Sequence, residues 1–258
     1  MTRAVRVAES SLEPGERTLS EAASRYLVRV HRLAPGRAFS LFDPEARLEA
    51  EATLTVAHPR RARCRIDAVR AAPTPSGRRT TLVQALGKGD KPDQVLRDAT
   101  QLGVSRVVFA LTERSVVSLG ERAASRATRW RQIALDAARQ SGRPDVPELG
   151  PFAALGEVLA EVDAPLCLLL HPAGGQPLLA ALSGAPADAG LVLLIGPEGG
   201  FSDAERGLAR EHGFSPVTLG RLVLRTETAA VAALGAVLAA DEARGESGAT
   251  LVRSLPHA

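Results

Sequence analysis

Alternating hydrophobic and polar residues mark the first third of the chain as a region of short β-strands. One helical pattern interrupts them at Ser20–Leu33, where Tyr26, Leu27 and Val30 share a face. The predicted strands are Arg3–Val7, Ala38–Phe42, Arg47–Val56 and Cys64–Val69. Together these segments predict a small β-barrel.

The pattern changes after Ala72–Arg79, whose proline, glycine and polar residues are typical of a linker. Nearly continuous apolar segments follow, of the kind found in strands that are buried on both faces. They are Thr81–Leu86, Val104–Leu111, Leu166–Leu170, Leu191–Ile195 and Pro216–Leu219. Because helical patterns separate them, we expect an α/β fold whose parallel sheet is covered on both faces.

Four helices are predicted in this second part of the chain. Asp90 is placed to cap the first, and Pro92 suits its first turn. Ser202 and Glu205 form a capping box at the start of the third. The four are Asp90–Leu102, Ala127–Gln140, Ser202–Gly213 and Thr226–Ala243. The predicted division is a β-barrel domain (1–71), a linker (72–80), an α/β domain (81–245) and a C-terminal tail (246–258).

Composition narrows the class of protein. A chain of 258 residues, 45% hydrophobic and 24% charged, is typical of a globular protein. Cys64 and Cys167 form no CxxC pair, which predicts a reducing, cytoplasmic location and no metal site. Met1–Ser10 lacks the apolar segment of a signal peptide, and Ala229–Ala240 is too short to cross a bilayer. We therefore expect neither secretion nor membrane insertion.

Charge is distributed unevenly along the chain. Residues 1–80 hold 15 arginines and nine acidic residues, a net charge of +6, whereas the whole chain carries +3. A basic N-terminal third suggests a polyanionic partner. A GC-rich coding sequence is an alternative explanation for arginine in place of lysine, but it does not explain the asymmetry.

Three glycine-containing loops follow apolar strands, at the place where open α/β sheets bind ligands. They are Leu170–Gly175, Leu194–Ser202 and Leu219–Ala229. Glycine allows the backbone to approach a ligand closely, although glycine also simply turns the chain. The GxGxxG and GxxxxGK[ST] nucleotide motifs and the GxSxG hydrolase motif are absent from the sequence. The loops therefore predict a ligand site of a different kind.

With these loops, the sequence resembles the 16S ribosomal RNA uridine-N3 methyltransferases of the RsmE type, in the SPOUT superfamily, over nearly its whole length. The two most specific segments are Leu194–Gly200 and Leu219–Ala229. Supporting segments are Arg25–Gly36, Lys88–Lys91, Leu102–Arg106, Glu113–Val116, Arg129–Trp130 and Gln140–Arg143. Gln101 and Arg139 depart from the pattern, since the family usually has glutamate there.

The resemblance implies a PUA-like N-terminal barrel and a SPOUT methyltransferase domain with a C-terminal trefoil knot. It also implies S-adenosylmethionine as the cofactor, a homodimer as the working unit and 16S rRNA, within the small ribosomal subunit, as the substrate. The expected cofactor-binding residues are Leu170, His171, Ile195, Gly196, Pro197, Gly199, Leu219, Gly220, Leu224 and Thr228. For the leucines, ordinary core packing is the alternative.

Methylation at N3 of uridine removes a proton that is bound at neutral pH, so the site needs a proton acceptor or a cation that stabilises the anion. We expect Arg225 to stabilise charge on the ring, and Thr226 and Glu227 to position the base or assist proton removal. Glu198 is a second candidate carboxylate. The alternatives are an Arg225–Glu227 ion pair, a helix cap at Thr226 and a purely loop-shaping Glu198.

N3 lies on the base-pairing edge, so the target uridine must be unpaired or flipped out. Arg25, Arg29 and Arg32 fall on one face of the predicted helix and are the best candidates for phosphate contacts, with a solvated basic face as the alternative. For Trp130 we expect a core or dimer contact.

Two other functions stay open at this point, a ribose 2′-O-methyltransferase and a non-catalytic RNA-binding protein of the same fold. The sequence also leaves open whether free RNA or an assembled subunit is the substrate, and which residue acts as the general base.

Overall fold

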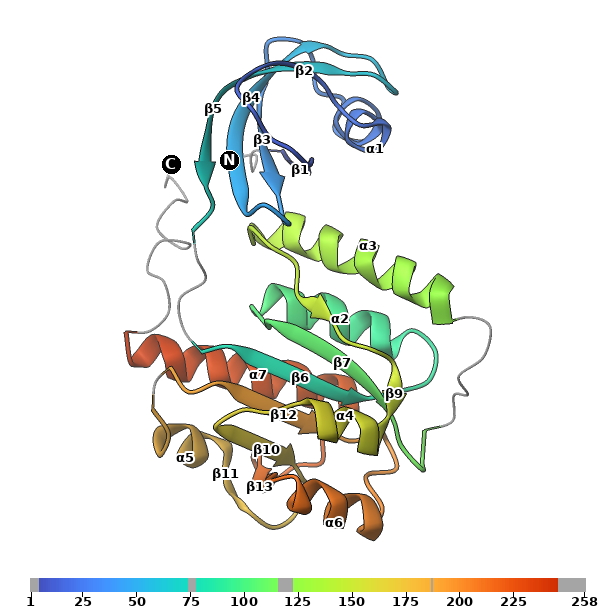
Figure 1. Ribbon diagram of the computed structural model, residues 1–258, viewed down its shortest axis with the longest axis vertical. Coiled ribbons are helices and arrows are strands. Elements are labelled where there is room, and N and C mark those ends of the chain that lie inside the picture. Colours follow the sequence, from blue (N-terminus) through green and yellow to red (C-terminus); the bar gives the residue numbers. More distant parts are fainter. Residues whose placement is uncertain (1–4, 74–77, 116–122, 187, 246–258) are drawn as a thin grey trace. The chain divides into compact units, whose positions relative to one another are not determined.

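The computed structural model describes residues 5–73, 78–115, 123–186 and 188–245 (Figure 1). By its contacts the chain divides into two compact units. Unit 1 comprises Met1–Thr74, Ala138–Val146 and Thr250–Ala258, and unit 2 comprises Pro75–Ala137 and Pro147–Ala249. The predicted tail (246–258), the polar stretch around Glu121, the start of the first predicted strand and part of the predicted linker lie outside the described residues.

Unit 1 is built on a five-stranded sheet with the order β1-β3-β4-β5-β2. The β1 and β3 strands are parallel, and the other neighbours are antiparallel. The strands are β1 (Arg6–Ala8), β2 (Gly15–Thr18), β3 (Ala38–Asp43), β4 (Leu48–Val56) and β5 (Arg63–Ala71). The sequence analysis missed β2, whose residues Gly-Glu-Arg-Thr show no apolar alternation because this strand lies at the edge of the sheet.

The predicted helix Ser20–Leu33 is shorter and less regular in the structure. It consists of α1 (Glu21–Arg25), capped by Ser20, and a π-helical turn, η1 (Tyr26–Val30). Arg32 follows with a φ of +52°, which ends the helix. The expectation that Arg25, Arg29 and Arg32 share one helical face is therefore wrong, although all three side chains are exposed.

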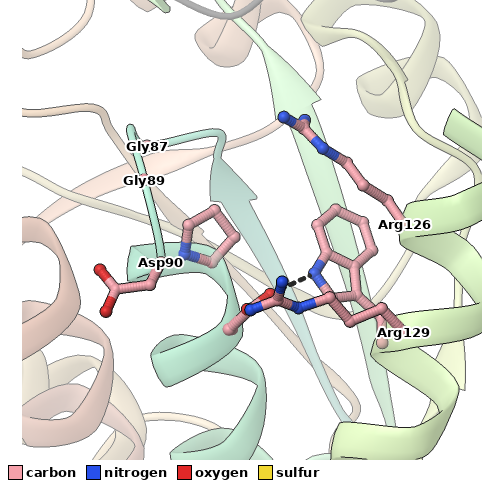
Figure 2. A pocket seen from close by; sticks show the side chains of 8 residues that line it. Gly87, Gly89, Asp90, Arg126 and Arg129 are labelled. Atoms are coloured by element: carbon pink, nitrogen blue, oxygen red, sulfur yellow. Dashed lines mark hydrogen bonds and ion pairs between the residues drawn. The ribbon is translucent and has the colours of Figure 1, made fainter. Parts of the chain in front are cut away.

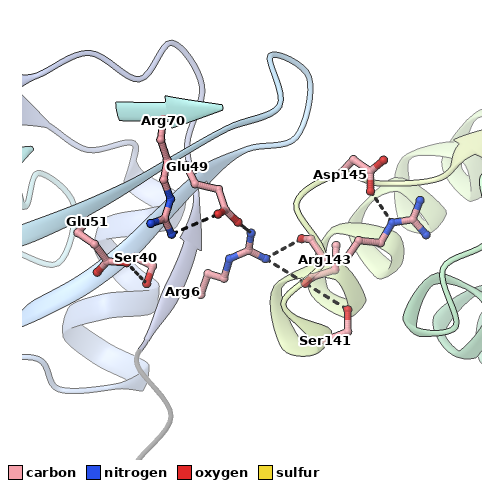
Figure 3. A network of polar contacts seen from close by, with 9 residues as sticks. Arg6, Ser40, Glu49, Glu51, Arg70, Ser141, Arg143 and Asp145 are labelled. Atoms are coloured by element: carbon pink, nitrogen blue, oxygen red, sulfur yellow. Dashed lines mark hydrogen bonds and ion pairs between the residues drawn. The ribbon is translucent and has the colours of Figure 1, made fainter. Parts of the chain in front are cut away.

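In unit 1, residues 138–146 are tied to the sheet by Arg6 of β1 (Figure 3). Its guanidinium lies 2.5 Å from Glu49 Oε1 and donates to the carbonyl of Arg143 at 2.6 Å. Arg139, one of the two departures from the family pattern, places its guanidinium 4.3 Å from the centre of the Tyr26 ring. The arginine therefore gains a cation–π contact at this position.

Unit 2 contains a parallel sheet, as predicted. Its strand order is β11-β13-β10-β12-β6-β7-β8, and β9 pairs with β7. The strands are β6 (Thr80–Ala85), β7 (Arg106–Leu111), β8 (Glu148–Leu149), β9 (Ala153–Ala154), β10 (Leu166–Leu170), β11 (Gln176–Pro177), β12 (Leu191–Ile195) and β13 (Ser215–Thr218). The two-residue strands β8, β9 and β11 were missed because segments of this length carry no periodicity.

Helices cover both faces of this sheet. All five residues of β12 are buried, and Val192 and Leu194 share a core cluster with residues of α4 and α6. The helices are α2 (Lys91–Gln101), α3 (Ala123–Ser141), α4 (Leu155–Glu161), α5 (Leu178–Ser183), α6 (Asp203–Glu211) and α7 (Thr226–Ala243). The α7 helix packs against α2 and α5. The short helices α4 and α5 were not predicted.

The predicted helix caps have two different outcomes. In α6, Ser202 Oγ accepts from the Glu205 backbone N–H and the Glu205 carboxylate accepts from the Ser202 N–H, which confirms the capping box. Asp90 occupies the cap position of α2, but its side chain makes no capping hydrogen bond, so that detail is wrong. Within the described residues, no helix is long and apolar enough to cross a membrane.

Candidate active site

The carboxyl ends of β6 and β12 meet the first turn of α7 through two buried hydrogen bonds. Gln84 Nε2 donates to Thr226 Oγ1 at 2.7 Å, and Thr226 Oγ1 donates to the Gly196 carbonyl at 2.7 Å. Gln84 is 2% exposed and Thr226 is 5% exposed. Thr226 is the first residue of α7 and Arg225 takes the cap position, so the alternative of a Thr226 cap is wrong. The Thr226 hydroxyl instead joins the end of β6 and the loop after β12 to α7.

Two carboxylates lie beside this junction and share one lysine. Lys91 Nζ is 2.5 Å from Glu198 Oε1 and 3.6 Å from Glu227 Oε2. The hydrogen bond with Lys91 lowers the pKa of Glu198, and the same bond raises the pKa of Lys91. Both groups therefore carry their charges at neutral pH.

Sequence reasoning missed Lys91 as a site residue. It lies 107 residues from Glu198, and no spacing rule links the two positions. The only available signal was the short segment Lys88–Lys91, which entered the sequence analysis as a match to the family.

Arg225 stands free at the edge of this group. Its backbone is extended and its side chain is exposed. Within the described parts of the chain it makes no ion pair, and Glu227 pairs with Lys91 instead. The alternative of an Arg225–Glu227 ion pair therefore finds no support in the structure, and the guanidinium is available to a ligand.

The predicted cofactor residues gather at one edge of the sheet. Leu170 and Ile195 are opposite each other in neighbouring parallel strands, and Leu170 also faces Val217 of β13. Ile195 and Pro197 are buried. Leu170, His171, Gly196, Leu219 and Leu224 are half-buried, whereas Gly199, Gly220 and Thr228 are exposed. The His171 ring is hydrogen-bonded locally to the Ala173 backbone.

Glycine is required at one position of these loops and favoured at a second. A Cβ atom at Gly175 would stand 2.1 Å from the Pro216 carbonyl oxygen, and the φ of Gly175 is +96°. At Gly196 a Cβ atom would stand 3.0 Å from the Phe201 ring. These glycines therefore allow close packing of the loops, which agrees with the alternative that glycine simply turns the chain here. They also leave the backbone at the sheet edge without side chains of its own.

The segment between β13 and α7 exposes two large apolar side chains that the sequence analysis did not single out. Leu222 is 80% exposed and Val223 is 82% exposed. Because β13 pairs with β10 while Thr226 contacts Gly196 and Gln84, this segment crosses the carboxyl ends of β10 and β12.

An open pocket of about 400 Å³ lies at the start of α2, between the loop before this helix and α3 (Figure 2). Its wall includes the indole of Trp130, which donates to Asp93 Oδ1 at 2.9 Å and packs 4.3 Å from the Phe109 ring centre. Trp130 is thus a core residue, as expected. The other lining residues are Gly87, Gly89, Asp90, Pro92, Asp93, Arg126 and Arg129.

No group of three or more metal-ligating side chains occurs among the residues that the structure describes.

Comparisons of the sequence and of the structure with known proteins both find similarity to methyltransferases. A family model described as an RNA methyltransferase domain matches residues 74–238. The ribosomal RNA small subunit methyltransferase E of Synechocystis is 33% identical over 224 residues, which cover 85% of this chain and 72% of that protein. The enzyme of the same name from Mycobacterium tuberculosis is 32% identical over 214 residues, 81% of this chain and 80% of its own.

Two similar solved structures contain the cofactor. A putative methyltransferase from Legionella pneumophila with bound SAM superposes with a TM-score of 0.83 at 34% identity, over 93% of this chain and 98% of that one. The ribosomal RNA small subunit methyltransferase E of Neisseria gonorrhoeae, bound to S-adenosyl methionine, gives 0.82 at 31% identity, over 92% and 98%. The chain therefore belongs to the family of RNA methyltransferases that contains the ribosomal RNA small subunit methyltransferases E.

Proposed function

We propose that this protein transfers a methyl group from S-adenosylmethionine to N3 of a specific uridine in small-subunit ribosomal RNA. The observation that carries the proposal is the grouping of two carboxylates, Glu198 and Glu227, around one lysine beside the Gly196 loop, next to Thr226. Arg225, the residue before Thr226, is exposed and makes no ion pair within the described residues. Relatives with 32–33% identity are named as ribosomal RNA small subunit methyltransferases, which supports the substrate class.

The residues at the sheet edge fit the proposed cofactor. Leu170, Ile195, Leu219 and Leu224 would offer apolar walls for an adenine ring, and the half-buried backbone at Gly196 would offer it hydrogen-bonding groups. When bound, S-adenosylmethionine supplies an activated methyl group on a sulfonium ion. The glutamates nearby carry the opposite charge. His171, Pro197, Gly199, Gly220 and Thr228 complete the proposed cofactor site.

The protein's own groups would then deal with the N3 proton and the charge that its loss leaves behind. A carboxylate, Glu198 or Glu227, accepts the proton directly or through water. Arg225 donates hydrogen bonds to a uracil carbonyl oxygen, where the negative charge develops. Thr226 acts indirectly, because its hydroxyl fixes the Gly196 carbonyl and the start of α7.

We expect Thr226→Val to weaken cofactor affinity by about tenfold, because the change removes a hydrogen-bond partner of the buried Gln84 amide and of the half-buried Gly196 carbonyl, at a cost of about 1–3 kcal/mol. Isothermal titration calorimetry with S-adenosylmethionine measures the effect. Thr226→Ser is the matched control, since it keeps the hydroxyl. Equal affinity in the valine and serine variants would show that the hydrogen bonds do not support the cofactor site.

The N-terminal unit is the proposed RNA-binding part. Its exposed arginines Arg25, Arg29 and Arg32 stay candidates for phosphate contacts even though they do not share one helical face. Arg25 is also paired with Glu21 at 2.8 Å, an exposed contact that costs little to exchange for a phosphate.

Combined alanine substitution of Arg25, Arg29 and Arg32 should weaken RNA binding and reduce the slope of log affinity against log salt concentration by about 2, since each lost phosphate contact with single-stranded RNA removes about 0.7. Fluorescence anisotropy over a salt series measures the slope. A charge-matched control replaces three exposed arginines of unit 2, Arg97, Arg131 and Arg210, with alanine. An unchanged slope in the triple variant would assign the three arginines to an idle surface.

Four further features belong to this proposal. Two concern the domains: a PUA-like barrel (1–71) followed by a linker (72–80), and a trefoil-knotted SPOUT domain (81–245) followed by a tail (246–258). The other two are a homodimer and a cytoplasmic location. The crossing of residues 219–225 over the ends of β10 and β12 supports the knot. The exposed Leu222 and Val223 support a partner surface. Two free cysteines support a reducing compartment.

Nucleoside mass spectrometry tests the proposed reaction. The protein is incubated with labelled S-adenosylmethionine and either naked small-subunit rRNA or purified subunits. Labelled 3-methyluridine at one position is the expected product, and the comparison shows which form of the substrate is needed. A label that protects the RNA from alkaline cleavage would indicate ribose methylation instead. Cofactor binding without any label would point to another RNA, and absence of both would favour a non-catalytic role.

A further inference from the structure

We propose that Lys91 is a positioning residue of the methyl-transfer site, which ties Glu198 to Glu227 and holds both carboxylates in place to receive the N3 proton. The proposal rests on the function proposed above and assigns a role to a residue outside the loops predicted from the sequence. The geometry that carries it is one ammonium group in contact with two carboxylates from different elements.

Three chain segments converge at this lysine. Lys91 begins α2, Glu198 lies in the loop after β12, and Glu227 lies in the first turn of α7. The loop before α2 packs directly against Glu198, because a Cβ atom at Gly87 would stand 3.6 Å from Glu198 Oε1 and 3.5 Å from Lys91 Cβ. Lys91 therefore links the start of α2 to the loop after β12 and to the first turn of α7.

The two glutamates need a cation between them. Since both contact the same nitrogen atom, their oxygens lie within about 6 Å of each other, where one negative charge disfavours the other. The side chain of Glu227 is only 12% exposed, and that of Lys91 is 28% exposed, so water screens the repulsion incompletely. Glu227 Oε2 has no hydrogen-bond partner among the described residues, which leaves the lysine as its neutralising contact.

Within the described residues, the other charged groups around the cluster make no ion pair with Glu198 or Glu227. Lys88, in the loop before α2, acts on Glu198 through space, and Arg225 stands at the start of α7. From the remaining side, Arg114 donates to the Gly199 carbonyl. Asp93 of α2 is already occupied by Trp130 and Arg129. Lys91 is the cation with direct contacts to both carboxylates.

The proton transfer gives the proposal a distinct pH signature. The N3–H bond breaks and its proton passes to a carboxylate, the N3 electron pair forms the new bond to the methyl carbon, and the carbon–sulfur bond breaks with its electrons left on sulfur. A carboxylate accepts this proton only while it is ionised. Without Lys91 the pKa of Glu198 rises, because the hydrogen bond that now lowers it is lost. The acid side of the rate profile then moves to higher pH.

The test compares Lys91→Met, Lys91→Arg and Lys88→Met in the full-length protein. Single-turnover methylation is measured from pH 4 to 8.5 at saturating cofactor. We expect Lys91→Met to lose about ten times more activity at the acid end of this range, where Glu198 of the variant is largely protonated, than at pH 8.5, the effect of a shift of about one pKa unit. Lys91→Arg should restore most of the rate and the wild-type profile. Lys88→Met removes an equal charge from the loop before α2 and should shift the profile much less, because Lys88 makes no direct contact with Glu198.

Two outcomes would overturn the proposal: a loss in Lys91→Met that is equal at every pH, as expected for a merely structural role, or a shift of the same size in Lys88→Met. A second measurement does not depend on activity. With ¹³C-labelled glutamate, the carboxyl carbon of Glu198, assigned through Glu198→Gln, should titrate at higher pH in Lys91→Met than in the wild type. Unchanged titration rejects the role of Lys91, whereas a wild-type protein that makes no 3-methyluridine rejects the proposed function and leaves the titration result standing.

Discussion

Arg225→Ala is expected to slow methyl transfer by about 100- to 1000-fold, the usual effect of removing one donor that stabilises a developing anion. Affinity for S-adenosylmethionine should be nearly unchanged. The reason is geometric: the guanidinium is exposed, makes no ion pair within the described residues and stands next to Thr226, whose hydroxyl is anchored in the loop junction. Single-turnover kinetics and calorimetry separate the two quantities.

Arg221→Ala is the matched control, because Arg221 is an exposed arginine of the same inter-element segment. It should keep most of the wild-type rate. If Arg225→Ala instead abolishes cofactor binding, Arg225 is a binding or structural residue. If Arg221→Ala slows transfer equally, the effect belongs to the net charge of the segment rather than to a hydrogen bond on the uracil ring.

The sequence predicted the central strands and the last helix well, for a physical reason. β10, β12 and α7 have the predicted bounds, because a strand buried on both faces is apolar at every position and a long alanine-rich helix has few competing conformations. The strand-end loops followed from these elements, since parallel strands place their carboxyl ends at one edge.

Contacts between residues that are far apart in the sequence could not be predicted from the local pattern of each segment. The bond between Gln84 and Thr226 joins residues 142 positions apart, and neither residue stands out in its own segment. Gln84 lies in a strand that reads as ordinary core, and Thr226 reads as a helix cap. Only the fold brings the two side chains together. The helix-cap alternative, which the local sequence around Thr226 favoured, was therefore wrong.

The helical segment of unit 1 shows a different limit of prediction from the sequence. Its apolar positions Tyr26, Leu27 and Val30 fit an α-helical period, but the chain forms a π-helical turn and then a residue with positive φ. A π-helix adds a residue to the turn, which moves every later side chain around the axis. The face that Arg29 and Arg32 occupy therefore cannot be obtained from a period of 3.6 residues.

Arg78→Met should lower the stability of unit 2 by about 3–5 kcal/mol, because it leaves Asp241 as an uncompensated buried charge. Composition placed Arg78 in the predicted linker, but its side chain is fully buried and its Nε lies 2.9 Å from Asp241 Oδ1, near the end of α7. Its guanidinium also donates to the Ala189 carbonyl at 3.4 Å. The pair therefore fastens the start of β6 to the helix that carries Thr226 and Glu227.

Thermal unfolding followed by circular dichroism measures the effect, and a fall in Tm of about 10 °C is expected. The double variant Arg78→Met/Asp241→Leu is the control, because it removes both charges and should recover a large part of the loss. An equal fall in Tm in the two variants would mean that the packing of Arg78, not its charge, stabilises the unit. Since the pair lies at the opposite end of α7 from Arg225, the folded fraction of Arg78→Met should methylate RNA at the wild-type rate, which separates a residue that holds the helix from those that act on the uridine.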